Sequence, residues 1–323
     1  MPLVNLSHVT TYSYNQPVRF GEHRLMVRPR ESYDQHLISA ELTLHPEPKE
    51  VRWLQDVFGN AVAIATFDTA HDELRIENKA RLEHIPSDLT DVHIEDYARN
   101  YPFTYSSEEM PDLLRSIERQ HHDPQRKIDT WARRFVGTGR DTSTLALLTE
   151  MTNAIKREFT YVPRHQKGTQ SPLETLELGT GTCRDYAMFM IEAVRALGLA
   201  ARFVSGYVYN PSGRRRAIGG GNTHAWVRVY LPGSGWVEFD PTNAIIGTRG
   251  LIRVAVARDI YQAVPISGAY IGFPGSYLGM NVSVDIHVDQ PAETDPAPIL
   301  LQPQSGETES LAEGAHDANP RRL

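Results

Sequence analysis

Hydrophobic positions in the first part of the chain occur in short runs and not at helical intervals. Up to about residue 85 these runs are β-branched or aromatic, and turn-forming residues separate them. Such runs predict β-strands, and we place three of them at Val51–Trp53, Val62–Phe67 and Leu74–Ile76. We therefore predict an all-β, sandwich-like N-terminal domain over residues 1–95.

The hydrophobic spacing changes after a polar connector over residues 96–122. Hydrophobic residues then recur every three or four positions, which predicts amphipathic helices. One helix is expected over residues 123–136, and a second is expected to reach Phe159 with Thr142 as its N-cap.

The third helix is the most clearly marked. Thr182 and Asp185 have the spacing of a capping box, in which two polar side chains satisfy free N–H groups at the start of a helix. A hydrophobic stripe follows, and Gly198 lies where a glycine commonly ends a helix. The sequence therefore predicts a helix whose first residue is Cys183.

Strands are expected again after the third helix, at residues 202–209, 223–231 and 236–240. Helices followed by a sheet indicate the α+β class, and we place this second domain at residues 123–285. The remaining segment, 286–323, is rich in Pro, Ala, Glu, Gln, Gly and Ser, so we expect a disordered tail.

Composition narrows the range of functions. The 323 residues suggest about two domains, and the net charge of −7 argues against a general nucleic-acid binder. A single cysteine excludes an internal disulfide and two-cysteine metal sites, and we expect neither a metal nor a cofactor. The chain contains no run of 18 apolar residues, so we expect no transmembrane helix. The N-terminus does not resemble a secretory signal. We therefore expect a cytoplasmic protein.

The single cysteine lies at a chemically distinctive position. If Cys183 is the first residue of a helix, the partial positive charge and free N–H groups of the helix N-terminus stabilise a thiolate. The same N–H groups could bind a developing oxyanion. The alternative is that Cys183 is a small buried hydrophobic residue, as free cysteines often are.

A histidine and an aspartate are predicted to meet on a β-hairpin. Residues 223–231 alternate strictly between polar and apolar, and a short turn leads into 235–240. Placing both apolar sets on one face pairs Val229 with Val237, which brings Asp240 diagonally opposite His224 on the other face. Alternatively, His224 is an ordinary polar surface residue and Asp240 ends a strand.

Several short motifs occur along the chain in a fixed order: His8–Tyr14, Val27–Arg30, Asp56–Asn60, Gly181–Ala187, Leu197–Tyr207, Thr223–Trp226, Trp236–Asn243, Val254–Asp259 and Val264–Gly268. Together they resemble bacterial transglutaminase-like proteins. The resemblance covers roughly residues 1–285 and places the family's catalytic triad at Cys183, His224 and Asp240. It implies a transglutaminase-like, papain-like cysteine-enzyme core behind a β-rich N-terminal domain. Arg184 departs from the family pattern, in which glutamine is more frequent, and a second departure is the basic loop 210–222 with Arg214–Arg216.

The resemblance implies a cysteine-dependent hydrolase that cleaves amide, peptide or isopeptide bonds through a thioester acyl-enzyme. A transglutaminase that transfers the acyl group to an amine uses the same triad, and a non-catalytic binding scaffold is the third alternative. The expected partner is a peptide or another amide, not nucleic acid or a membrane, and the oligomeric state stays open. Oxyanion donors would be the Cys183 N–H and a second group. Tyr161 is a weak candidate for that group, and core packing is the favoured alternative for this residue.

Overall fold

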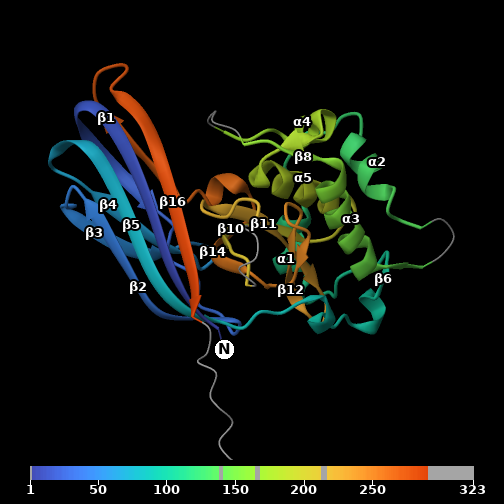
Figure 1. Cartoon of the computed structure of the whole chain (residues 1–323). Coiled ribbons are helices and arrows are strands. Elements are labelled where there is room, and N and C mark those ends of the chain that lie inside the picture. Colours follow the sequence, from blue (N-terminus) through green and yellow to red (C-terminus); the bar gives the residue numbers. More distant parts are fainter. Residues whose placement is uncertain (1, 138–140, 164–167, 212–216, 290–323) are drawn as a thin grey trace, which may run out of the picture. The chain divides into compact units, whose positions relative to one another are not determined.

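A long N-terminal strand organises the first sheet of the computed structural model, which describes residues 2–137, 141–163, 168–211 and 217–289 (Figure 1). The strand pairs with β16 over residues 3–14 and with β15 over 19–25, and with β5 over 3–19 and β4 over 23–25. Side chains of β1, β4 and β5 share one core, which includes Tyr14, Phe20, Ala65 and Leu74. The β-rich prediction for the N-terminal region is confirmed. The seven antiparallel strands are β1 (Leu3–Leu25), β2 (Gln35–His45), β3 (Glu50–Gln55), β4 (Ala61–Thr66), β5 (Ala70–His84), β15 (Ile266–Ile271) and β16 (Tyr277–Asp289).

The last two strands correct the predicted domain boundaries. Residues 266–285 were expected in the second domain and residues from 286 in the tail, but β15 and β16 pair along β1, from Leu25↔Ile266 to Leu3↔Asp289. Local alternation of polar and apolar residues marks a strand without showing which distant strand it will pair with. The sequence therefore did not predict that β15 and β16 pair with β1.

Five α-helices lie between β5 and β15 in the described part of the chain. The helix predicted over residues 123–136 is shorter than expected. The backbone of Arg126 is in the left-handed conformation, so the helix begins only at Lys127. The Asp123 carboxylate accepts hydrogen bonds from the N–H groups of Lys127 and Ile128 at this helix start. Ser143, not Thr142, caps the second predicted helix. The helices are α1 (Met110–Ile117), α2 (Lys127–Arg133), α3 (Thr144–Glu158), α4 (Pro172–Leu178) and α5 (Cys183–Ala196), with 3-10 turns at Leu89–Asp91, Asp96–Ala98 and Ile260–Gln262.

The second large sheet has the order β13-β12-β11-β10-β14. Helix α5 packs against β10 and β11, and its apolar side chains share a core with the inward residues Phe203, Val227 and Phe239. Together with the first sheet, this confirms the α+β class. The strands are β10 (Ala201–Val208), β11 (His224–Leu231), β12 (Gly235–Asp240), β13 (Ile245–Ile246) and β14 (Leu251–Ala257); the short pairs are β6 (Asn100–Tyr101) with β7 (Thr142–Ser143) and β8 (Thr160–Tyr161) with β9 (Thr180–Gly181).

Two buried amide side chains from the first sheet region cover the edge strand β14. Gln35 accepts from the Arg253 N–H and donates to its carbonyl, both at 2.9 Å. Asn60 accepts from the Val256 N–H at 2.9 Å and donates to its carbonyl at 2.7 Å. Each amide thus replaces a pairing strand at one residue of β14, satisfying backbone groups that burial would otherwise leave unpaired.

The polar face of the predicted hairpin is covered as well, because His224, Glu238 and Asp240 are buried and Arg228 is half-buried. Glu238 is only 2% exposed, because Arg253 donates to it at 3.0 Å and Arg228 pairs with it at 3.1 Å. Arg253 also pairs with Asp34 of the N-terminal region. These ionic contacts compensate the cost of burying the carboxylates, so alternation here does not mark a solvent face.

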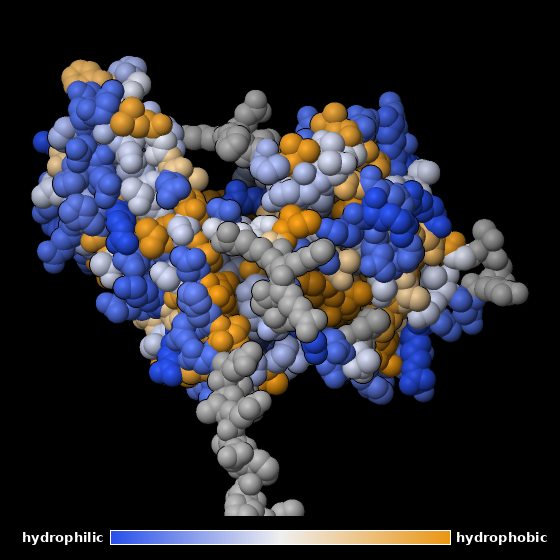
Figure 2. All heavy atoms as spheres, viewed as in Figure 1, coloured by the Kyte–Doolittle hydropathy of each residue, from blue (hydrophilic) through white to orange (hydrophobic). Residues whose placement is uncertain are grey.

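Hydrophobic side chains reach the surface in separate patches on the face shown in Figure 2. Ile271, Phe273 and Leu278 are among the exposed large hydrophobic residues, all near the β15–β16 turn. Among the helices that the structure describes, none has the length and apolar character needed to cross a membrane.

Candidate active site

Helix α5 begins at Cys183, as the capping box predicts. The Asp185 carboxylate accepts from the Thr182 N–H at 2.8 Å and from the Gln170 N–H at 2.8 Å, and the Gly198 N–H closes the other end on the Arg195 carbonyl. Cys183 is 6% exposed. Its sulfur is therefore held at the positive end of a helix whose first turn is rigidly anchored.

The hairpin register is also confirmed. Val229 pairs with Val237, and His224 Nε2 lies 2.8 Å from Asp240 Oδ2. Both side chains are fully buried. The His224 ring is further held by a stacked contact with Trp226, with ring centroids 5.9 Å apart.

A residue that sequence reasoning did not assign a role holds the aspartate. Asn243 donates to Asp240 Oδ2 at 2.9 Å, and Thr242 N–H donates to Oδ1 at 2.9 Å. Asn243 is itself fixed, because its Oδ1 accepts from the Ile218 N–H at 2.9 Å. Its spacing of three residues after Asp240 was visible, but spacing alone did not show that the chain turns back on the carboxylate.

The second nitrogen of His224 is left without a partner among the described residues. Since Nε2 is occupied by Asp240, Nδ1 is the atom available to Cys183. Nδ1 forms no hydrogen bond of ordinary geometry in the described part of the chain, and hydrogen bonds at catalytic sites are often long or poorly aligned before substrate binds. Gly219, with φ +85°, lies against this atom: a Cβ there would be 2.7 Å from Nδ1.

The pKa values of the three groups favour a thiolate–imidazolium pair. Burial raises the pKa of Cys183, but hydrogen bonding and charge from His224, with a contribution from Arg184, outweigh it and lower the pKa. Burial lowers the pKa of His224, but the Asp240 charge and hydrogen bond outweigh it and raise the pKa. The pKa of Asp240 is lowered despite burial, mainly by His224. A proton therefore favours the imidazole over the sulfur.

Tyr161 lies close to the sulfur. Strand β8 pairs Tyr161 with Gly181, two residues before the cysteine. Burial raises the pKa of Tyr161, and the charge of Cys183 and a hydrogen bond with it raise it further. The phenol thus stays protonated and can donate a hydrogen bond beside the nucleophile.

The two sequence departures have different outcomes. Arg184 is exposed, and its Nη2 donates to Thr223 Oγ1 at 3.5 Å. Arg214–Arg216 lie outside the described residues.

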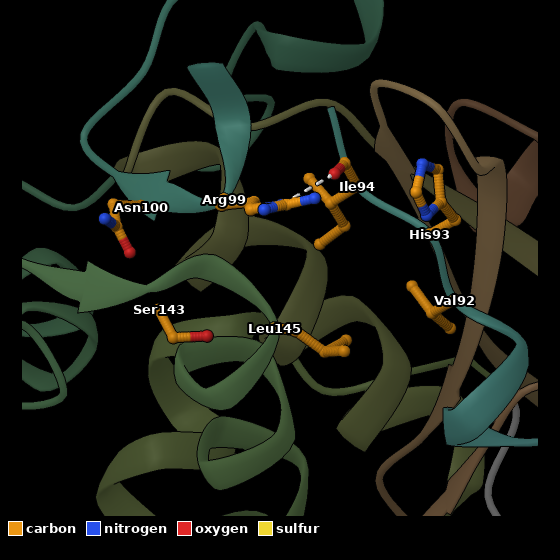
Figure 3. A pocket seen from close by; sticks show the side chains of 7 residues that line it. All are labelled: Val92, His93, Ile94, Arg99, Asn100, Ser143 and Leu145. Atoms are coloured by element: carbon orange, nitrogen blue, oxygen red, sulfur yellow. Dashed lines mark hydrogen bonds between the residues drawn. The ribbon is translucent and has the colours of Figure 1, made fainter. Parts of the chain in front are cut away.

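Figure 3 shows a separate surface pocket of about 400 Å³, with Arg99 donating to the Ile94 carbonyl at 3.3 Å. None of its lining residues belongs to α5, β11 or β12, so it is not part of this site. The lining residues are Val92, His93, Ile94, Arg99, Asn100, Ser143 and Leu145.

Within the described ranges, no group of three or more His, Cys, Asp and Glu side chains is arranged to hold a metal ion.

Two family descriptions match the chain in succession. A bacterial transglutaminase-like N-terminal region matches residues 4–83, and the transglutaminase-like superfamily matches residues 129–241, which include Cys183, His224 and Asp240. The chain belongs to the transglutaminase-like superfamily. The suspected resemblance is thereby confirmed for both parts.

Two relatives of this transglutaminase-like chain differ in how much of it they match. An uncharacterised protein of Mycobacterium tuberculosis is 26% identical over 312 residues, covering 87% of this chain and 91% of that protein. The protein-glutamine gamma-glutamyltransferase of Pseudomonas aeruginosa is 37% identical over 103 residues, covering 29% of this chain and 15% of that one.

The fold has a solved counterpart. The crystal structure of a candidate cysteine protease from Cytophaga hutchinsonii superposes with a TM-score of 0.63 at 19% identity, covering 89% of each chain. The transglutaminase-like chain therefore shares a cysteine-protease-like fold.

Proposed function

We propose that this chain is a cysteine-dependent amide hydrolase that acts on peptide or isopeptide bonds. The observation that carries the proposal is the buried arrangement of Cys183 at the N-terminus of α5 with His224, whose far nitrogen is held 2.8 Å from Asp240. Nucleophile, base and orienting carboxylate are the three groups that thiol acyl transfer requires.

Acylation begins when the Cys183 thiolate attacks the amide carbon. The carbonyl oxygen becomes an oxyanion, for which the free N–H of Cys183 and the Tyr161 hydroxyl are the proposed donors. His224 then gives its proton to the leaving amine as the carbon–nitrogen bond breaks, which leaves a thioester. Asp240 stabilises the imidazolium and fixes the orientation of the ring.

Deacylation uses the same imidazole as a base. His224 takes a proton from water, the hydroxide oxygen attacks the thioester, and the carbon–sulfur bond breaks to release the acid and restore the thiolate. We favour water over an amine as the acceptor because water needs no second binding groove. The partial identity with a protein-glutamine gamma-glutamyltransferase supports amine transfer as the alternative.

Mass spectrometry separates these outcomes. The chain is incubated with a glutamine-containing peptide library, with and without a primary amine, and Cys183→Ala serves as the control. Released acid supports the hydrolase, and an amine adduct in preference to acid supports the transferase. If a thioester never forms on Cys183 and no peptide changes mass, the chain is a non-catalytic scaffold.

A further inference from the structure

The active-site helix exposes one side chain, and it lies beside the nucleophile. Arg184 is exposed, Ala196 is half-buried, and the other twelve residues of α5 are buried. Because Arg184 directly follows Cys183, the helix reaches solvent next to the sulfur. The Arg184 charge is near enough to the sulfur to help lower the pKa of Cys183.

Arg184 also links the two elements that carry the reacting groups. Its Nη2 contacts Thr223 Oγ1 at 3.5 Å, and Thr223 immediately precedes His224. This is a long, weak hydrogen bond, and in the described ranges Arg184 forms no ion pair. Most of the guanidinium's five N–H donors are therefore free to bind a ligand.

The helix itself disfavours a cation at this position. The N-terminal end of a helix carries partial positive charge, so an arginine in the first turn is normally unfavourable. Lowering the pKa of Cys183 requires positive charge alone, which a lysine would also supply. A guanidinium adds the planar pair of donors that matches a carboxylate in a bidentate contact.

We propose that Arg184 is a specificity-determining residue that binds a carboxylate next to the scissile amide. The inference rests on the proposed function, because it assigns a substrate class to the same site. The preferred substrate is then a peptide whose residue beside the cleaved bond carries an acidic side chain or a free C-terminal carboxylate.

Three matched fluorescent peptides test this assignment. They are an amidated Ala-Gln-Glu, an amidated Ala-Gln-Gln and an Ala-Gln-Gln with a free carboxylate, so the last two differ only at the C-terminus and the first two only at the side chain. Binding is measured by fluorescence polarisation to Cys183→Ala, and kcat/KM is measured on the wild-type chain. We expect at least one carboxylate peptide to bind about 10-fold or more tightly than the neutral one.

Substitutions assign the preference to the guanidinium. Arg184→Gln should abolish it, Arg184→Lys should keep only part of it, and the exposed Arg52→Gln in β3 should leave it unchanged. The ratio between peptides is the readout, because loss of the Arg184 charge also affects Cys183 with every substrate.

The outcomes separate this inference from the proposed function. If the wild-type chain cleaves neutral and acidic peptides equally, the carboxylate site is refuted and the hydrolase stands. If Cys183→Ala binds acidic peptides through Arg184 while the wild-type chain cleaves none, the carboxylate site stands and the hydrolase is refuted. Equal binding of all three peptides, or a preference that survives Arg184→Gln, overturns the inference.

Discussion

Gly219→Ala should misplace the histidine with little loss of stability. The new Cβ would lie 2.7 Å from His224 Nδ1, about 0.7 Å short of ordinary contact. The ring has little room to retreat, because Asp240 holds it on the far side at 2.8 Å and it is fully buried. A misplacement of about 1 Å costs about 10²-fold in rate, or about 2.7 kcal/mol of barrier.

Gly235→Ala is the matched control. Gly235 has φ +69°, and a Cβ there meets nothing within 4 Å. Both variants therefore incur the cost of a left-handed alanine, about 1 kcal/mol, but only the variant at Gly219 pushes on the imidazole. Urea unfolding should show similar small losses of stability for the two.

Alkylation of Cys183 by iodoacetamide at pH 6 is an assay that needs no substrate. Gly235→Ala should react at the wild-type rate, whereas Gly219→Ala should react many-fold more slowly because its thiol loses the imidazolium. A folded Gly219→Ala variant with both wild-type alkylation and wild-type turnover would refute the placement of His224 against this loop.

Three further predictions concern titration, orientation and stability. The plot of kcat/KM against pH should be bell-shaped, with activity rising as pH passes the lowered pKa of Cys183 and falling only as pH passes the raised pKa of His224. If activity instead rose at the ordinary thiol pKa near 8.5, the thiolate–imidazolium pair would be contradicted. Asp240→Asn should reduce kcat by about 10²–10⁴-fold and move the alkaline limb to lower pH, measured over a full pH series. Asn60→Ala should lower the free energy of unfolding in urea by about 2–4 kcal/mol, because it leaves the buried N–H and C=O of Val256 unpaired. The exposed Asn281→Ala is the control, and equal losses would show that the amide does not hold β14.

Local features of the site could be read from sequence. The capping box around Cys183 spans four residues, and the His224–Asp240 pair is separated by 16 residues within one hairpin. In both cases the periodicity of a single element or turn determines which atoms meet. The same reasoning gave no indication that Glu238 on the hairpin's polar face is buried, because its surroundings include Arg253 and Asp34 from elsewhere in the chain.

Long-range features could not be predicted in this way. Asn60 meets Val256 across 196 residues, and Gln35 meets Arg253 across 218. Neither amide belongs to a periodic pattern. From a single sequence, an asparagine or glutamine is normally assigned to a turn or to the surface, even when the structure buries it. The catalytic roles of Cys183, His224 and Asp240 remain predictions, although their geometry is now described.

The pairing of β1 with β16 has a consequence for synthesis of the protein. Leu3 and Asp289 are partners, so ribosomal elongation must add about 280 residues before this ladder can close. At about 5–20 residues per second, the first strand waits roughly 15–60 s for its neighbour. During that interval its open hydrogen-bonding edge is available to other nascent chains, and β5 alone can shield the opposite side.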